Sequence, residues 1–278
     1  MATELEIQDY LSANFHVINE IEPFHKPQII ESLNEIGLDT VKVSINTDDF
    51  ERYLLETNSI YPETYKQAFG TYFKRKALEH FCSFQLLKIE STDIYMDVAS
   101  SGSAVPAILK DYFQLKTVWK QDIRYPEGID VENKIIGSNA ASIPLESESI
   151  DKIALHCSFE HFEKGADIGF IKELGRILKA GGKACILPLY MNKKHHILSN
   201  LELITKLGIP GFDKEVPVYI QDRPNNHFGR FYDASALKHR VIDSAKSIGL
   251  EIDIVDLSFT NPKDYGIGTN LSLVLTRP

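Results

Sequence analysis

Residues 94–113 read IYMDVASSGSAVPAILKDYF, which is a short apolar run, then a turn of tiny residues, then an amphipathic segment. The apolar run, residues 94–99, has the length and composition of a buried strand. In the segment after the turn, apolar side chains recur at helical spacing, at Val105, Ile108, Leu109, Tyr112 and Phe113. A strand that turns directly into a helix is the basic unit of a sheet covered by helices. This stretch therefore predicts an α/β fold.

The same alternation continues along the chain. Further strands are expected at residues 117–121, 134–137, 152–156, 183–189, 251–259 and 270–276, and helices at residues 167–178 and 233–248. The last two strands are joined by residues 260–269, which are too few for a crossover helix, so these strands should pair antiparallel. We expect a doubly wound, mostly parallel seven-stranded sheet whose last strand is antiparallel.

Two segments do not show this alternation of strands and helices. Residues 1–90 contain apolar residues at helical spacing and no trustworthy strand alternation, which predicts a helical N-terminal cap. Residues 91–278 then form the Rossmann-like domain. Within it, residues 191–232 are rich in Gly and Pro and fit no regular element, so we expect an insert that acts as a lid.

Composition restricts the function. The 278 residues carry a net charge of −9, which disfavours a nucleic-acid-binding face. No apolar run approaches membrane-spanning length and the first residues do not resemble a signal peptide, so we expect a cytoplasmic protein without a membrane partner. The cysteines, Cys82, Cys157 and Cys185, are odd in number and far apart, so neither a disulfide framework nor a metal site is expected.

The turn after the first strand favours a nucleoside ligand. It contains five tiny residues in succession, which are Ala99, Ser100, Ser101, Gly102 and Ser103. Such a turn lets a ligand lie against the backbone. Asp122 follows Gly102 by twenty residues and ends the second strand, where an acid binds ribose hydroxyls in doubly wound folds. NAD is disfavoured, because its G-x-G-x-x-G turn needs more glycines than this one offers.

Four later stretches carry a family resemblance. They are IIGSNAASIPL (135–145), SIDKIALH (149–156), FEHF (159–162) and ELGRILKAGG (173–182). In order and spacing they resemble the class I S-adenosylmethionine-dependent methyltransferases, whose R-x-L-K-P-G-G turn precedes the fifth strand. The resemblance covers residues 93–190 by motif and residues 233–277 by topology. It implies S-adenosylmethionine as donor and S-adenosylhomocysteine as product.

The resemblance also implies a donor site. Its residues would be Asp97, Ala99, Ser100, Ser101, Gly102, Ser103, Asp122, Ile123, Asn139, Ala140 and His156. Asp97 would lie near the methionine ammonium group, Asp122 would bind the ribose, and Ile123 would pack on the adenine. Asn139 would accept a hydrogen bond from the adenine amino group. Ala99, Ser101 and Ser103 stand at the three glycine positions of the family's D-x-G-x-G-x-G turn, which is a departure from the pattern.

The expected activity is methyl transfer to a small molecule, with an oxygen of a secondary metabolite as the acceptor atom. His161 follows the fourth strand and is the candidate general base, because imidazole has a suitable pKa. A methyltransferase-like binding or scaffold protein that has lost catalysis is the alternative, motivated by the missing glycines. A protein methyltransferase with an open groove is a third interpretation. A homodimer is left open.

Overall fold

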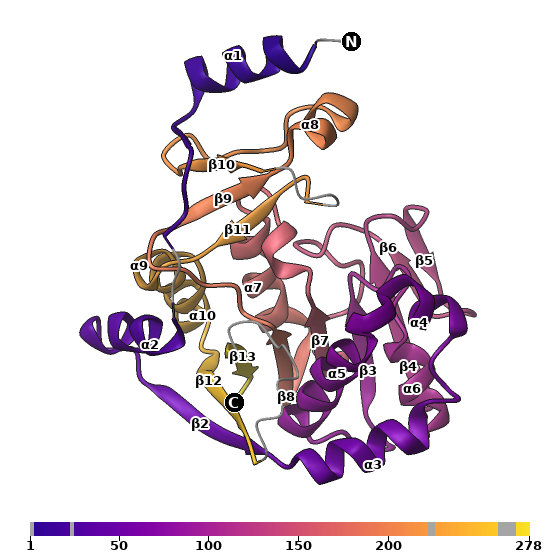
Figure 1. Ribbon diagram of the computed structural model, residues 1–278. Helices are drawn as coiled ribbons and strands as arrows, with labels where there is room; N and C mark the ends of the chain where they lie inside the picture. Colours follow the sequence, from indigo (N-terminus) through magenta and orange to yellow (C-terminus); the bar gives the residue numbers. More distant parts are fainter. Residues whose placement is uncertain (1–2, 23–24, 222–225, 261–270) are drawn as a thin grey trace.

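The main sheet organises the molecule (Figure 1). The computed structural model describes residues 3–22, 25–221, 226–260 and 271–278. Within these residues nine strands form this sheet. In order they are β2 (Thr40–Ile45), β12 (Glu251–Phe259), β13 (Leu271–Thr276), β8 (Leu178–Leu187), β7 (Ile150–His156), β3 (Ile94–Val98), β4 (Thr117–Asp122), β6 (Ile135–Gly137) and β5 (Gly128–Asp130). The central strands β6, β4, β3, β7 and β8 run parallel, so the predicted α/β fold is confirmed.

The order of the C-terminal strands also agrees with the sequence. β13 runs antiparallel to both β12 and β8. The expected connection between β12 and β13 falls on residues 261–270, which lie outside the described residues. The described sheet has two strands more than the seven expected, namely β2 and β5. Both lie at its edges, where β2 keeps most of its side chains partly or fully exposed and β5 has only three residues, so neither gives a clear apolar pattern.

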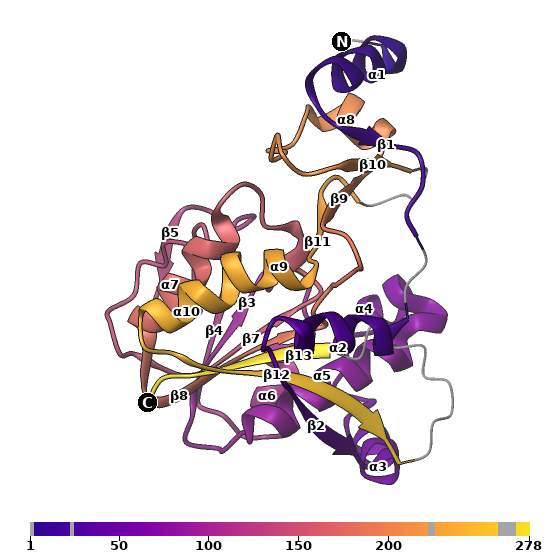
Figure 2. The ribbon, with the colours of Figure 1, turned by 90° about the vertical axis from the view of Figure 1, so that its left-hand side faces the viewer.

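Helices cover both faces of the sheet (Figure 2). One face carries α3 (Thr47–Thr57), α4 (Glu63–Phe69), η1 (Gly70–Tyr72), α5 (Phe73–Leu87) and α6 (Val105–Asp111). The other carries α2 (Lys26–Glu35), α7 (Ala166–Ile177), α9 (Ala234–Leu237), η3 (Lys238–Ile242) and α10 (Asp243–Ser247). Successive residues of β3 face opposite cores, since Tyr95 packs in the first and Met96 in the second.

The first ninety residues are more than a helical cap. They contribute β1 (Val17–Ile18) and β2, which pair with the distant strands β10 and β12 respectively. An edge strand that finds its partner more than two hundred residues away leaves no local sequence signal. The domain boundary that the sequence places near residue 90 stays a prediction.

The insert folds into a small sheet of its own, beyond the end of β8 (Figure 1). Its strand order is β1, β10 (Val218–Ile220), β9 (His196–Ser199) and β11 (Gly229–Phe231). The helices α1 (Glu4–Asn14) and α8 (Leu201–Leu207) pack together beside it. Ile7 and Leu11 of α1 share an apolar core with Ile197 and Ile204 of the insert. The described part of the insert is therefore a folded unit completed by the N-terminal segment, and the role of the insert as a lid stays a prediction.

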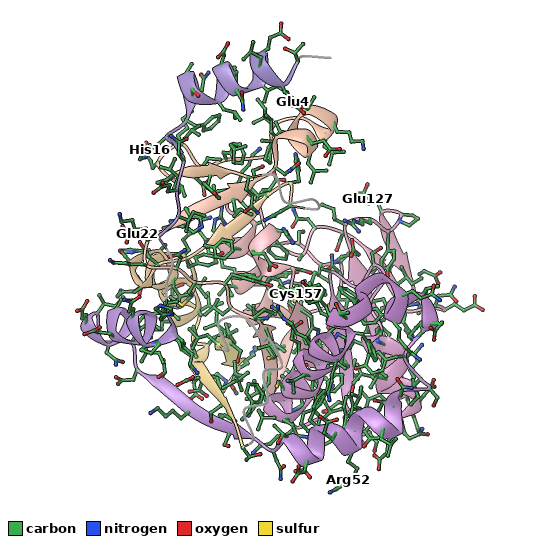
Figure 3. All side chains as sticks on the ribbon, viewed as in Figure 1. Glu4, His16, Glu22, Arg52, Glu127 and Cys157 are labelled. Carbon is green, nitrogen blue, oxygen red and sulfur yellow. The ribbon has the colours of Figure 1, made fainter. Side chains whose placement is uncertain are left out.

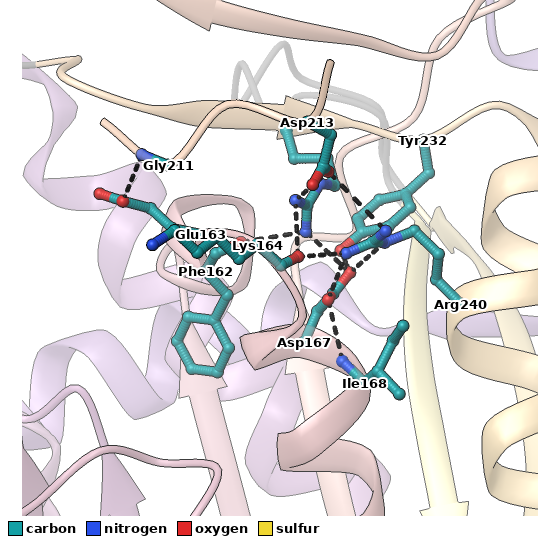
Figure 4. A network of polar contacts seen from close by, with 10 residues as sticks. Phe162, Glu163, Lys164, Asp167, Ile168, Gly211, Asp213, Tyr232 and Arg240 are labelled. Carbon is teal, nitrogen blue, oxygen red and sulfur yellow. Dashed lines mark hydrogen bonds and ion pairs between the residues drawn. The ribbon is translucent and has the colours of Figure 1, made fainter. Parts of the chain in front are cut away.

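A buried ionic network attaches the insert to the main sheet (Figure 4). Asp167, in the first turn of α7, accepts from Arg230 of β11 at 2.9 Å, from Arg240 of η3 at 2.8 Å and from the Tyr232 hydroxyl at 2.7 Å. Arg230 also donates to Asp213 at 2.8 Å and to two backbone carbonyls. Burial opposes ionisation of Asp167, but the two arginines hold its pKa below the ordinary value. The network fixes the insert against α7.

No helix in the described ranges is long and apolar enough to cross a membrane.

Candidate active site

Asp97 ends β3 at the edge where the parallel strands terminate. Its side chain is buried, and its carboxylate accepts hydrogen bonds from the hydroxyls of Ser100 and Ser103. Burial raises the pKa of Asp97 to about 7. The turn continues through Ala99, whose φ of 58° lies in the left-handed region that favours glycine. This backbone explains why the related turn carries a glycine at this position, and alanine is the least bulky alternative.

His156, the last residue of β7, faces Asp97. The Ser83 hydroxyl donates to the His80 carbonyl, so it must accept from His156 Nε2, which lies 2.7 Å away. This leaves Nδ1 as a lone pair, 4.0 Å from Asp97 Oδ1. His156 Nδ1 has no hydrogen-bond partner in the described part of the chain, and burial lowers the pKa of this histidine to about 4. A buried acceptor without a donor, His156 Nδ1, thus lies beside the Asp97 carboxylate.

Asp122 lies at the neighbouring strand end, on β4. Its carboxylate oxygens accept from the backbone amides of Ser101 and Arg124, each at 2.8 Å. These bonds hold the carboxylate against the Asp97 turn, and each oxygen keeps a lone pair for another donor. Ile123 follows with 74% of its side chain exposed, which leaves it free to cover a flat ring. The Tyr125 hydroxyl bonds to Ser100.

Asn139 and Ala140 follow the third parallel strand, β6. Ala140 is buried in the core beside the sheet. The side-chain oxygen of Asn139 accepts from the Ala141 amide at 2.9 Å, so it caps its own turn. The oxygen expected to accept from the adenine thus already has one partner, and only its second lone pair is available.

His161 lies in η2 (Phe159–His161), the short helix that follows β7. Its Nδ1 donates to the Phe228 carbonyl of the insert, and its Nε2 lies 3.7 Å from Glu160. Its side chain is 46% exposed. None of the described hydrogen bonds joins His161 to the 97–103 turn, so its imidazole is turned toward the insert.

Sequence reasoning missed a polar group at the same strand ends, which we call the Lys76 cluster: Lys76, Glu79, Cys157, Glu160 and Tyr190. Lys76 and Glu79 come from α5, Cys157 and Glu160 follow β7, and Tyr190 follows β8. Cys157 lies near the centre of the molecule (Figure 3). The signal that the sequence offered was Glu79, the single acid of α5, next to His80.

The Lys76 cluster is closely connected. Lys76 Nζ lies 2.9 Å from Glu79 Oε2 and 2.7 Å from Cys157 Sγ, and the Cys157 thiol donates to Glu79 at 3.2 Å. Tyr190 bonds to Cys157. Burial raises the pKa of Cys157 to about 12, so its sulfur stays a neutral thiol. Beside the cluster, His80 bonds to the hydroxyls of Tyr61 and Tyr65 at 3.1 and 3.3 Å.

A cavity of about 400 Å³ lies elsewhere, where residues 16–22 cross the insert. It is lined by His16, Ile18, Glu20, Ile21, Glu22, Asn192, Lys193, Lys194, His195, His196 and Pro217. None of the residues predicted for the donor site lines it. The strand-end groups around Asp97, which match the sequence motifs, are therefore the better candidate.

Comparisons with known proteins agree with this location. A family model described as a methyltransferase domain matches residues 97–186. No curated protein matches the sequence.

Solved structures with similar folds include three from bacteria and archaea. The PH0226 protein from Pyrococcus horikoshii is 19% identical with a TM-score of 0.41, over 79% of this chain and 93% of that one. An S-adenosylmethionine-dependent methyltransferase from Thermotoga maritima is 16% identical with a TM-score of 0.38, over 77% and 99%. The YcgJ protein from Bacillus subtilis is 16% identical with a TM-score of 0.34. This match covers 41% of the present chain and 51% of the YcgJ chain, about half of its length.

The residues matched by the family model begin at Asp97 and end in β8, so they contain the parallel strands whose ends carry the site. The strand order and this match together show a methyltransferase domain with the class I fold, for which S-adenosylmethionine is the methyl donor.

Proposed function

We propose that the chain methylates an oxygen of a small-molecule acceptor, with the donor held between Asp97, His156 and Asp122. The carrying observation is the pair of buried acceptors, Asp97 Oδ1 and His156 Nδ1, 4.0 Å apart. A primary ammonium group has three hydrogens and can donate to both atoms. The methionine part of the donor carries such a group, so these residues fit it.

The remaining donor contacts follow from the same strand ends. Asp122, fixed by two backbone amides, would accept from the ribose hydroxyls. Residues 99–103 would let the ligand approach the backbone, and Ile123 would cover the adenine, with Asn139 and Ala140 on its other side. When bound, S-adenosylmethionine supplies a methyl group that its positively charged sulfur already activates. The chain has to align the acceptor, exclude water and receive a proton.

A small acceptor is supported by how the site is covered. Helix α5 reaches the strand ends on one side, where Lys76 bonds to Cys157 and Ser83 to His156, and the anchored insert lies beyond the end of β8. The net charge of −9 disfavours a nucleic acid. A covered site lined by aromatic and polar side chains suits a small organic molecule.

Calorimetric titration with S-adenosylhomocysteine tests donor binding. Asp122→Ala should weaken binding tenfold or more, since it removes charge-assisted hydrogen bonds of about 1.5 to 3 kcal/mol each. Asp122→Asn keeps one carbonyl oxygen, so its affinity for S-adenosylhomocysteine should lie between those of the wild type and Asp122→Ala. Asp243→Asn is the matched control, because Asp243 pairs with Lys238 on the exposed side of α10. Equal affinity in Asp122→Ala and in the control would refute the assignment.

Labelled donor and metabolite extracts test the reaction itself. Transfer of label to small molecules is expected, and a heat-treated extract provides the acceptor in the absence of other enzymes. If the chain binds S-adenosylhomocysteine but labels nothing in such extracts, the non-catalytic scaffold becomes the better interpretation.

A further inference from the structure

The Lys76 cluster contains an unsatisfied carboxylate oxygen. The Glu160 side chain is only 9% exposed, and its Oε2 atom is buried without a hydrogen-bond partner among the described residues. A buried carboxylate without a donor is costly, so native structures keep such groups mainly where a ligand or a reaction uses them. The missing partner of Glu160 is a hydrogen-bond donor.

The charges that act on Glu160 come from two elements. Lys76 and Glu79 of α5 and His161 of η2 each affect its pKa, and burial, the largest effect, raises that pKa. A carboxylate with a raised pKa is a better proton acceptor near neutral pH than an ordinary glutamate. Glu160 therefore has the chemistry of a base, and its environment supplies a nearby cation.

Lys76 is that cation. Burial opposes its charge, but the ion pair with Glu79 and the hydrogen bond to Cys157 raise the pKa of Lys76, so it stays an ammonium. It donates to Glu79 and to Cys157, and an ammonium has a third hydrogen. Glu79 also pairs with Arg75, at 3.2 Å, so Glu79 does not neutralise Lys76 alone. With 17% of its side chain exposed, Lys76 can reach a ligand oxygen.

Aromatic rings lie next to this ammonium. Lys76 Nζ is 5.6 Å from the centre of the Phe69 ring, and Phe69 packs against Tyr65 with ring centres 4.7 Å apart. Tyr65 in turn bonds to His80, whose ring contacts the ring of His156 at the donor site. Apolar ring surface therefore extends from the Lys76 cluster toward Asp97.

From this arrangement we infer that the acceptor is an acidic hydroxyl, phenolic or enolic, which gives its proton to Glu160 while the Lys76 ammonium stabilises the negative charge that develops on its oxygen. The O–H bond of the acceptor breaks, the proton passes to Glu160 Oε2, and the electron pair stays on the oxygen that is to be methylated. An amine acceptor fits less well, because it arrives as a cation beside Lys76. Glu160 thus takes the role of general base that was predicted for His161. The inference rests on the proposed function.

The inferred acceptor site can be tested by binding 4-nitrophenol to the complex of the protein with S-adenosylhomocysteine. The phenolate form of this probe absorbs visible light and the neutral form does not. In a buffer about one pH unit below the probe's own pKa, the wild-type complex should bind it saturably as phenolate. Lys76→Met should weaken this binding tenfold or more and restore the spectrum of the neutral phenol. Lys74→Met is the control, since Lys74 is 46% exposed and pairs with Glu51. It should behave like the wild type.

A measurement of where the proton goes shows whether Glu160 accepts it or only lies near the bound phenol. In the wild type the proton stays on the protein, so the binding heat should not depend on the ionisation heat of the buffer. In Glu160→Gln, which has nearly the same shape, the phenolate can form only by releasing a proton to the buffer, and the heat should change accordingly.

Three results would overturn the inference: no saturable binding, a Lys76→Met variant equal to Lys74→Met, or full proton release already in the wild type. S-adenosylhomocysteine affinity is measured first for every variant. If the wild type does not bind S-adenosylhomocysteine, the proposed function is refuted. If it binds S-adenosylhomocysteine but not 4-nitrophenol, only this inference is refuted.

Discussion

The buried pair of Asp97 and His156 makes donor binding sensitive to pH. With a pKa of about 7, Asp97 is largely protonated below neutral pH, whereas His156, with a pKa of about 4, stays neutral there. An ammonium group binds the carboxylate form, so below about pH 7 the proton on Asp97 must first leave.

We therefore expect the affinity for S-adenosylhomocysteine to fall as the pH drops from about 7 to about 5, by at most tenfold per pH unit. Asp97→Asn should bind more weakly at neutral pH and lose most of this dependence, because its amide does not titrate. Calorimetry across this range measures both. A wild-type affinity that is constant from about pH 8 to about pH 5 would show that Asp97 does not meet the ammonium.

Single residues divide clearly into those that the sequence could predict and those that it could not. The positions of Asp97 and Asp122 near strand ends were predictable, because their spacing follows the strand-turn-helix unit, and their role in binding the donor stays a prediction. Lys76 was not, since its partner Cys157 is 81 residues away and no local pattern links them. His161 was predicted as a base from its position after the fourth strand and the pKa of imidazole, and only the structure shows that its ring faces Phe228.

Among the elements, the buried parallel strands were predictable and the strands with distant partners were not. β3, β7 and β8 contain short apolar runs, and most side chains of these strands and of β4 are buried, as in strands covered on both faces. The insert gave no pattern, because its strands are only three or four residues long and need β1 as a partner. Short strands of this kind are stabilised by tertiary contacts more than by their own sequence.

The ionic network between α7 and β11 should dominate the stability of the insert. Arg230→Met removes one of the two arginines that pair with Asp167 and Asp213 and leaves Arg240 as the other, and breaking a buried ion pair costs about 3 to 5 kcal/mol. Lys238→Met, which removes an exposed pair with Asp243, should cost less than about 1 kcal/mol. Urea denaturation compares the two, and proteolysis within residues 192–221 should accelerate only in Arg230→Met. Similar denaturation midpoints would mean that the network contributes little.

At the scale of the whole molecule, the N-terminal segment holds the insert from the other side. Removing residues 1–18 deletes α1 and β1 and uncovers apolar residues such as Ile197 and Ile204. Hydrogen exchange should then increase in residues 196–220, while β3, β7 and β8 stay protected by their own neighbours. Leu5→Ala is the control, because Leu5 is 68% exposed. Unchanged exchange after the deletion would show that the insert is stable without α1.

The pairing of β1 with β10 and of β2 with β12 also sets an order for folding during synthesis. The first strands of the chain leave the ribosome early, but their partners begin at Val218 and Glu251. At roughly 5 to 20 residues per second, the ribosome needs about 10 to 40 s to make the intervening two hundred residues. During that time Leu11 and Ile45, both buried in the finished protein, have no strand to cover them. Neither sheet can be completed until the C-terminal part of the chain has emerged, so a nascent chain that stalls before residue 218 exposes two unpaired strands to aggregation.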